Sequence, residues 1–307
     1  MWRDRVRQVR RLPSAMVEQR REVHELARSV PALEAEIAGL RDQLRALRAV
    51  VEERPGLAYV ADGHAWVRTT WGGKVLVDTA DLLIAPWLML DGVWEPAVGD
   101  FVRSVLRPGD VFVDVGANVG YFTILAADAI RHVGHIYAFE ANPATYELLQ
   151  KTVTVNWMTS FITTEQLAVY EDTRTLEFVM PEHFAGNSSL ALDDRRREAP
   201  RIEVETISLD EYFAGRDMRA DLVKVDVEGA ELFVFRGMRK LVAANPALVV
   251  VCEWSQADMG DHYDPSDLLD EIAAHGFDTF HIGAEVRPIG RAELLDTPYA
   301  NLALRPR

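Results

Sequence analysis

The amino-acid sequence predicts an α/β domain built on a mostly parallel sheet, with a separate helical segment in front of it. In the larger part of the chain, short apolar runs such as 111–115 alternate with segments of helical periodicity. This alternation is typical of parallel strands buried between two layers of helices. Residues 1–54 instead repeat apolar side chains at heptad spacing. We therefore expect a helical segment over 1–54 and an α/β domain over 55–307.

The composition narrows the class of protein. The chain has 307 residues and a net charge of −15. This excess of acid argues against nucleic acid as a partner, because phosphate binding needs clustered Lys and Arg. The single cysteine, Cys252, excludes an internal disulfide and fits a reducing compartment. Since we find neither a secretory signal nor an apolar run long enough to span a bilayer, we expect a cytoplasmic protein.

The N-terminal segment predicts a coiled coil over residues 16–53. Apolar residues recur in alternating steps of three and four, with mostly β-branched residues at position a and leucine at position d. This pattern favours a parallel two-stranded coiled coil, and hence a homo-oligomer. A single helix that packs on its own domain is the alternative. Pro31 should break or kink the helix at Val30. The heptad residues are Val23, Leu26, Val30, Leu33, Ile37, Leu40, Leu44, Leu47 and Val51.

Residues 1–21 form a basic tail, rich in arginine with interleaved apolar residues. Such a tail can make a weak contact with an anionic membrane surface, which would place the protein at the inner membrane face. A solvated tail with no partner is the simpler interpretation.

Residues 55–106 are expected to cover one end of the core and to contribute to substrate binding. Two β-like runs, Ala65–Thr70 and Lys74–Val77, flank Gly72-Gly73, which is a hairpin signal. Glu95, beside Trp94, is a candidate residue of the substrate cleft.

A glycine turn follows the strand at 111–115. Gly116 and Gly120 lie between this strand and the helical pattern that begins at Tyr121, where backbone N–H groups can face a ligand. The spacing is Gly-x-x-x-Gly, not the Gly-x-Gly-x-x-Gly of dinucleotide enzymes. Glu140 ends the next strand, where an acidic residue can accept hydrogen bonds from ribose hydroxyls. The combination predicts a ligand that contains adenosine.

The remaining elements follow the same alternation. Asn142-Pro143 is a helix N-cap followed by proline, and it predicts a helix through about Val155. Helical sequence also runs to Ala244 and from Pro265 to His275. The further strands are expected at Thr164–Val169, Thr175–Met180, Ile202–Thr206, Leu222–Val225, Leu248–Val251, Phe277–Ile282 and Ala300–Leu304.

Acidic residues follow the strands at 222–225 and 248–251. Asp226 and Glu228 come first, and Glu253 follows the next strand. Ligands of open α/β sheets collect at this edge, so these three are the candidate catalytic residues. A metal ion held by the same three carboxylates is the alternative, although no metal is assigned. The candidate substrate residues, chosen near these acids or on polar loops, are Glu95, His183, Asn187, Trp254 and His262.

From Trp94 to Leu304 the sequence resembles the FkbM family of S-adenosylmethionine-dependent O-methyltransferases. Its motifs lie in order at 108–120, 139–143, 208–210 and 223–231. The resemblance implies a class I, Rossmann-like methyltransferase sheet of seven strands, with one antiparallel strand near its C-terminal end. It implies that Ala168 flanks the adenine and that the acceptor is a hydroxyl of a sugar in a glycan, glycolipid or natural product. The residues it assigns to S-adenosylmethionine are Asp114, Gly116, Asn118, Gly120, Glu140, Asn142 and Ala168.

Two other functions remain open on the sequence alone. An NAD-dependent oxidoreductase could use the same type of sheet, although the glycine spacing does not favour it. A coiled-coil assembly protein could carry a methyltransferase domain that has lost activity.

Overall fold

We analysed a computed structural model of the full chain, which describes residues 56–179, 189–190, 200–260 and 262–307. It also describes Pro31, 36–37 and 39–43. By its internal contacts the chain divides into Met1–Arg54 and Pro55–Arg307. Among the described residues, no helix combines the length and the apolar character needed to cross a membrane.

The described part of the N-terminal unit is helical. Two heptad residues, Ile37 and Leu40, belong to it, and about half of each side chain is exposed. Pro31 is also in helical conformation. The remaining heptad residues and the basic tail lie outside the described residues.

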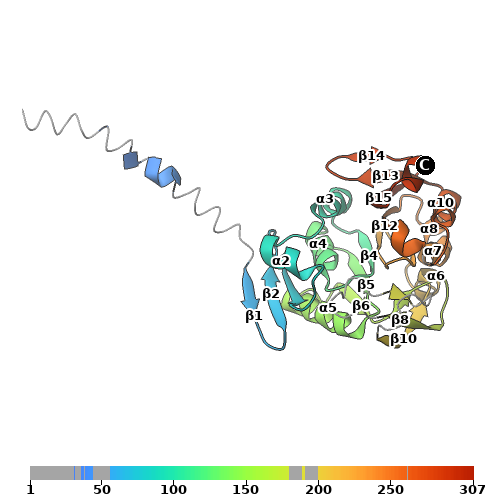
Figure 1. Ribbon diagram of the computed structural model, residues 1–307, viewed down its shortest axis with the longest axis horizontal. Helices are drawn as coiled ribbons and strands as arrows, with labels where there is room; N and C mark the ends of the chain where they lie inside the picture. Colours follow the sequence, from blue (N-terminus) through green and yellow to red (C-terminus); the bar gives the residue numbers. More distant parts are fainter. Residues whose placement is uncertain are drawn as a thin grey trace, which may run out of the picture. The chain divides into compact units, whose positions relative to one another are not determined.

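An eight-stranded mixed sheet forms the centre of the second unit (Figure 1). Its spatial order is β14-β13-β15-β12-β11-β4-β5-β6. The parallel strands are β4 (Val111–Val115), β5 (His135–Phe139), β6 (Ile162–Glu165), β11 (Leu222–Val225) and β12 (Val249–Ser255). Next to them, β15 (Tyr299–Pro306) runs antiparallel to both β12 and β13 (Phe277–Ile282).

The predicted count of seven strands in this sheet is wrong by one. The extra strand, β14 (Val286–Pro288), pairs antiparallel with β13 at the edge of the sheet. All three of its residues are exposed and one of them is a proline, so it has no apolar alternation from which it could be predicted. The antiparallel strand near the C-terminal end is present as predicted.

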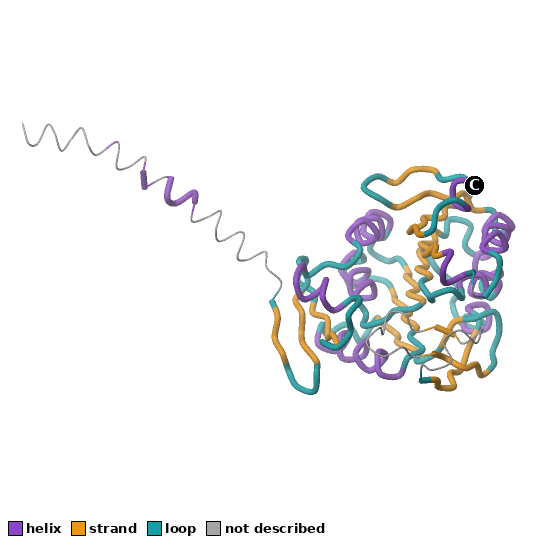
Figure 2. Tube along the Cα trace, viewed as in Figure 1, coloured by secondary structure: helices purple, strands orange, loops and turns teal. Residues whose placement is uncertain are grey.

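Helices cover both faces of the sheet (Figure 2). One buried cluster gathers residues of α2 (Ala85–Asp91), α3 (Pro96–Val105), α4 (Tyr121–Ala129) and α5 (Pro143–Val155). The other gathers residues of α6 (Leu209–Tyr212), α7 (Glu231–Arg236), α8 (Arg239–Ala244) and α10 (Pro265–Ala274). Neighbouring strand residues take opposite sides, as Phe112 and Val113 do. The polar chemistry is therefore left to the strand ends.

Helix boundaries follow local sequence signals. The Asn142 side chain accepts hydrogen bonds from the N–H groups of Ala144 (3.0 Å) and Thr145 (3.5 Å), so α5 begins where the sequence predicts. The helical stretch predicted up to Ala244 is broken at Gly237, where a Cβ would lie 2.2 Å from the Tyr170 carbonyl oxygen. Two short helices complete the described part of the unit, α9 (Gln256–Met259) and α11 (Arg291–Leu295).

Two smaller sheets flank the central one. The predicted hairpin is present as β2 (His64–Arg68) and β3 (Lys74–Asp78), extended by β1 (Leu57–Tyr59). The second sheet has the order β7-β10-β8-β9, with bounds Ala168–Val169, Arg201–Ile207, Thr175–Val179 and Ser189–Leu190. The strand predicted at Thr164–Val169 is therefore divided, because β7 leaves the central sheet and pairs with β10.

Candidate active site

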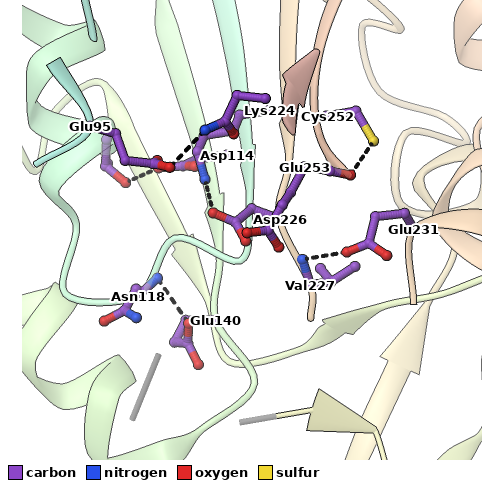
Figure 3. Close-up of polar contacts among 12 residues, drawn as sticks. Glu95, Asp114, Asn118, Glu140, Lys224, Asp226, Val227, Glu231, Cys252 and Glu253 are labelled. Carbon is purple, nitrogen blue, oxygen red and sulfur yellow. Dashed lines mark hydrogen bonds and ion pairs between the residues drawn. The ribbon is translucent and has the colours of Figure 1, made fainter. Parts of the chain in front are cut away.

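One cavity of about 340 Å³ lies at the carboxyl edge of the parallel strands. This volume is within the usual range for small-molecule sites. Residues 116–119 after β4 and Glu140 after β5 line one part of it. Asp226 after β11 and Glu253 near the end of β12 line another. Figure 3 shows the side chains of Asn118, Glu140, Asp226 and Glu253 at this edge. The structure therefore brings the predicted cofactor turn and the predicted acidic residues into one site.

The two glycines of the turn have different roles. Gly116 lines the cavity with a φ of 81°, and a Cβ there would lie 1.8 Å from the Asp226 carbonyl oxygen. Any side chain at 116 would thus separate the glycine turn from the acidic turn. Gly120 does not line the cavity, and its Cβ would meet Leu149 at 2.7 Å. Its missing side chain allows α4 and α5 to pack closely, and its contact with the cofactor stays a prediction.

Glu140 organises the cofactor part of the cavity. Its carboxylate accepts hydrogen bonds from the backbone N–H groups of Asn118 (2.9 Å) and Asn142 (2.8 Å). Burial raises the pKa of Glu140 to about 7, although these N–H groups lower it. A carboxylate has room for further donors, so Glu140 can still accept hydrogen bonds from ligand hydroxyls. Ala168 lines the cavity together with apolar Phe178, whereas the Asn142 side chain caps α5 and does not line it.

Asp114 lies behind the glycine turn and outside the cavity lining. It is fully buried and accepts a hydrogen bond from the Thr123 hydroxyl at 2.6 Å. Its Oδ1 has no hydrogen-bond donor among the described residues. Burial raises the pKa of Asp114, while the nearby Lys224 ammonium lowers it. Asp114 therefore does not face the cavity, and it can affect a bound ligand only by way of the glycine turn.

Lys224 is a site residue that the sequence reasoning missed. Its ammonium nitrogen is 2.6 Å from Asp226 Oδ2 and 4.7 Å from the centre of the Phe122 ring. Burial would lower the pKa of Lys224, but Asp226, Asp114 and Glu95 outweigh it and raise the pKa above its usual range. The sequence does contain a feature that could have revealed it, a lysine inside the continuous apolar run 222–225. A buried ammonium needs carboxylate partners, so a lysine in a buried strand indicates acidic residues nearby.

The three predicted catalytic carboxylates lie together. Oxygen atoms of Asp226, Glu228 and Glu253 are all within 4.8 Å of one another. Burial raises the pKa of Glu253 well above its usual range, and the nearby Asp226 and Glu228 raise it further. Glu253 Oε2 has no hydrogen-bond donor among the described residues. Oxygen atoms at this spacing could also hold a divalent cation.

Glu95 reaches the same cavity from a distant part of the chain. It precedes α3, and its Oε1 accepts hydrogen bonds from Asn301 Nδ2 (2.8 Å) and the Tyr299 hydroxyl (3.2 Å). Burial raises the pKa of Glu95, and the Asp226 charge adds to this effect. Tyr299 also lines the cavity and was not among the predicted site residues.

Of the other predicted substrate residues, the two that the structure describes, Trp254 and His262, do not line the cavity. Trp254 is fully buried and donates a hydrogen bond from Nε1 to the Thr297 carbonyl at 2.8 Å, which makes it a core residue. His262 is half-buried beside Gly229, outside the lining. His183 and Asn187 lie outside the described residues.

The site fits S-adenosylmethionine on three counts. Glu140 can accept hydrogen bonds from ribose hydroxyls, and apolar Ala168 and Phe178 offer a surface for the adenine. The carboxylates outnumber the cations in the described lining, which suits a sulfonium ion. The buried atom Glu253 Oε2 belongs to a residue of the cavity lining and has no hydrogen-bond partner in the described part of the chain.

Comparison with known proteins finds similarity to methyltransferases. The family model of the methyltransferase FkbM domain matches residues 114–279, more than half of the chain. Methyltransferase sdnD of Sordaria araneosa is 28% identical over 208 residues, which cover 57% of this chain and 76% of that protein. Hexuronic acid methyltransferase AglP of Haloferax volcanii is 28% identical over 155 residues, covering 49% of this chain and 60% of AglP.

The crystal structure of methyltransferase FkbM from Methylobacillus flagellatus aligns with a TM-score of 0.44 and 13% identity. The alignment covers 65% of this chain and 44% of that one. The chain thus spans less than two thirds of AglP and of the solved structure. Because the family model matches more than half of its length, the chain belongs to the FkbM family of methyltransferases, which confirms S-adenosylmethionine as its cofactor.

Proposed function

We propose that this protein transfers the methyl group of S-adenosylmethionine to a hydroxyl of a sugar, in a glycan, glycolipid or glycosylated natural product. The observation that carries the proposal is the single cavity in which Glu140 and the glycine turn meet Asp226, Glu228 and Glu253. The relative AglP is named for methylation of a hexuronic acid, which supports a sugar as acceptor class.

In this proposal the cofactor lies along the first two strand ends. Glu140 accepts hydrogen bonds from the ribose hydroxyls, while Ala168, Ala141 and Phe178 contact the adenine. The backbone of 116–119 surrounds the rest of the molecule. When bound, S-adenosylmethionine supplies an electrophilic methyl group on a positively charged sulfur.

Asp226 is the proposed general base. A hydroxyl is a poor nucleophile while protonated, so a carboxylate must take its proton as the new bond forms. The Lys224 ammonium, 2.6 Å from Asp226 Oδ2, holds this carboxylate in position at the cavity. Glu253 has a strongly raised pKa, so it is suited to donate a hydrogen bond to the acceptor.

Glu228 is proposed to orient the acceptor. Its φ of 53° is unusual for a residue other than glycine, and its side chain lines the cavity. Left-handed backbone at such residues is found preferentially at functional sites. A divalent cation held by Asp226, Glu228 and Glu253 is the alternative, and it would make methyl transfer sensitive to a chelator.

The N-terminal segment is proposed to form a parallel coiled-coil dimer. Exposed Ile37 and Leu40 on the described helical residues support this, because a partner helix would cover them. The dimer would carry two methyltransferase domains.

Calorimetric titration of the full chain with S-adenosylmethionine and with NAD tests the proposed function. We expect stoichiometric binding of S-adenosylmethionine and none of NAD. Binding of NAD alone would favour the oxidoreductase, and binding of neither would favour an assembly protein without activity.

A further inference from the structure

We propose that the acceptor subsite of this cavity takes an uncharged sugar ring, held against Trp94, Glu95 and Tyr299, and discriminates against acidic sugars. This inference rests on the proposed function and deepens it. All three residues line the cavity. All three also lie outside residues 114–279, the part matched by the family model. The subsite is therefore supplied by the segments that flank the family domain.

The subsite is built by joining distant segments. Trp94 and Glu95 precede α3, whereas Tyr299 opens β15. Glu95 Oε1 accepts hydrogen bonds from the Tyr299 hydroxyl (3.2 Å) and from Asn301 Nδ2 (2.8 Å). These bonds fix the carboxylate at the cavity wall.

The backbone of Glu95 indicates that this position is constrained. Its φ is 43°, in the left-handed region that residues other than glycine rarely adopt. Such conformations persist where the surrounding structure holds them, and they cluster at ligand sites. Here the conformation places a carboxylate in the cavity at the start of α3.

The residue types match a neutral sugar. Aromatic side chains such as Trp94 and Tyr299 present apolar surface to the C–H face of a ring. Carboxylates accept hydrogen bonds from hydroxyl groups, and charge-assisted bonds of this kind are the stronger ones. An uncharged polyhydroxylated ring can pack its C–H face on the aromatic side chains and donate hydrogen bonds from its hydroxyl groups to the carboxylates.

The charges do not match an acidic sugar. In the described part of the lining, Glu95 joins the carboxylates of Asp226, Glu228 and Asp258. The only cationic side chain in the same described lining is Lys224, which is paired with Asp226 at 2.6 Å. A carboxylate or phosphate on the acceptor would therefore meet like charge, and like-charge contacts are a strong basis for discrimination.

The test compares acceptors that differ only at C6. The full chain with saturating radiolabelled S-adenosylmethionine is given methyl glucoside and methyl galactoside, each beside its uronic acid counterpart. We expect kcat/KM for the neutral member to exceed that for the acidic member by about 100-fold. Glu95→Gln should reduce this ratio by about tenfold. The control is Glu147→Gln on α5, an exposed carboxylate paired with Lys151, which should leave the ratio unchanged.

Each outcome is decisive. An equal or larger kcat/KM for the uronic acids would overturn the inference and leave the proposed function intact. An unchanged ratio in Glu95→Gln would remove Glu95 from the subsite. If S-adenosylmethionine itself does not bind, the proposed function fails.

If S-adenosylmethionine binds and no glycoside is methylated, saturation-transfer NMR on the chain loaded with S-adenosylhomocysteine decides. Binding of the neutral glycosides in preference to the acidic ones supports the subsite. Binding of neither pair, or preferential binding of the acidic members, overturns it.

Discussion

Glu231 offers the sharpest test of how the acidic turn is held in place. It is the first residue of α7 and is fully buried. Its Oε1 accepts hydrogen bonds from the N–H groups of both Val227 and Gly229, each at 3.2 Å (Figure 3 shows the first). These residues belong to the turn that carries Asp226 and Glu228, in which Glu228 and Gly229 both have positive φ. We therefore expect Glu231 to position the proposed catalytic carboxylates without touching the substrate.

Glu231→Ala should be costly, whereas Glu231→Gln should be tolerated. Alanine leaves the N–H groups of Val227 and Gly229 without an acceptor, at about 1–3 kcal/mol each, so we expect a loss of about 2–6 kcal/mol in the free energy of unfolding. Glutamine keeps an oxygen in the position that accepts both bonds. The free energy of unfolding of Glu231→Gln at pH 7 should therefore be at most about 1 kcal/mol below that of the wild type, and it can exceed it.

The pH dependence gives a second measure of the same residue. Burial raises the pKa of Glu231 from 4.5 to about 7 in the folded chain. The buried carboxyl therefore contributes stability that is fully present below pH 4.5 and is lost as the pH rises through about 7. Relative to Glu231→Gln, the wild type should lose about 3 kcal/mol over this interval.

Urea denaturation of the three proteins at several pH values between 4.5 and 8 measures both effects, with Glu147→Gln as the surface control. Calorimetry with S-adenosylmethionine and methyl transfer complete the test, since only the alanine variant should lose transfer while it keeps cofactor affinity. Equal stability of the alanine and glutamine variants would refute this account of Glu231.

Three further predictions concern other parts of the chain. Burial raises the pKa of Glu140 to about 7, so protonation of this carboxylate below pH 7 should weaken its hydrogen bonds with the ribose hydroxyls. Calorimetry should therefore give about tenfold weaker binding of S-adenosylmethionine at pH 6 than at pH 8. Equal affinity at the two pH values would contradict the assignment of Glu140 to the ribose. Lys224→Met leaves Asp226 without its buried partner and should cost about 3 kcal/mol in urea denaturation, while a loss below about 1 kcal/mol would show that the pair contributes little. Light scattering should give a dimer for the full chain and a monomer for residues 55–307, and equal oligomeric states would reject the coiled coil.

The sequence was sufficient for the parts of the site that follow from strand order. In a parallel sheet, the residues after each strand meet at one edge, so Gly116, Glu140 and Asp226 could be placed together without knowing any packing. The alternation of side chains between the two faces of a strand could also have corrected the prediction of Trp254 as a substrate residue. Since Glu253 faces the cavity, its neighbour Trp254 must face the opposite side, where the structure buries it.

The remainder depended on contacts between distant segments. The pairing of Glu95 with Tyr299 and Asn301 joins the two flanks of the family domain, and no local pattern encodes it. Gly120 could not be separated from Gly116 by spacing, because only the packing of Leu149 shows which glycine serves helix contact. Lys224 was visible as an exception to its apolar strand, and its partners became clear only from the fold.

The measurement that bears most directly on the proposed chemistry is methyl transfer by Asp226→Asn, set beside its affinity for S-adenosylmethionine. Asparagine keeps the size of the side chain but cannot accept the hydroxyl proton. We predict an affinity within about threefold of the wild type and transfer to methyl glucoside reduced by about 100-fold or more. Transfer at the wild-type rate, with the cofactor bound equally well, would contradict the assignment of Asp226 as the base.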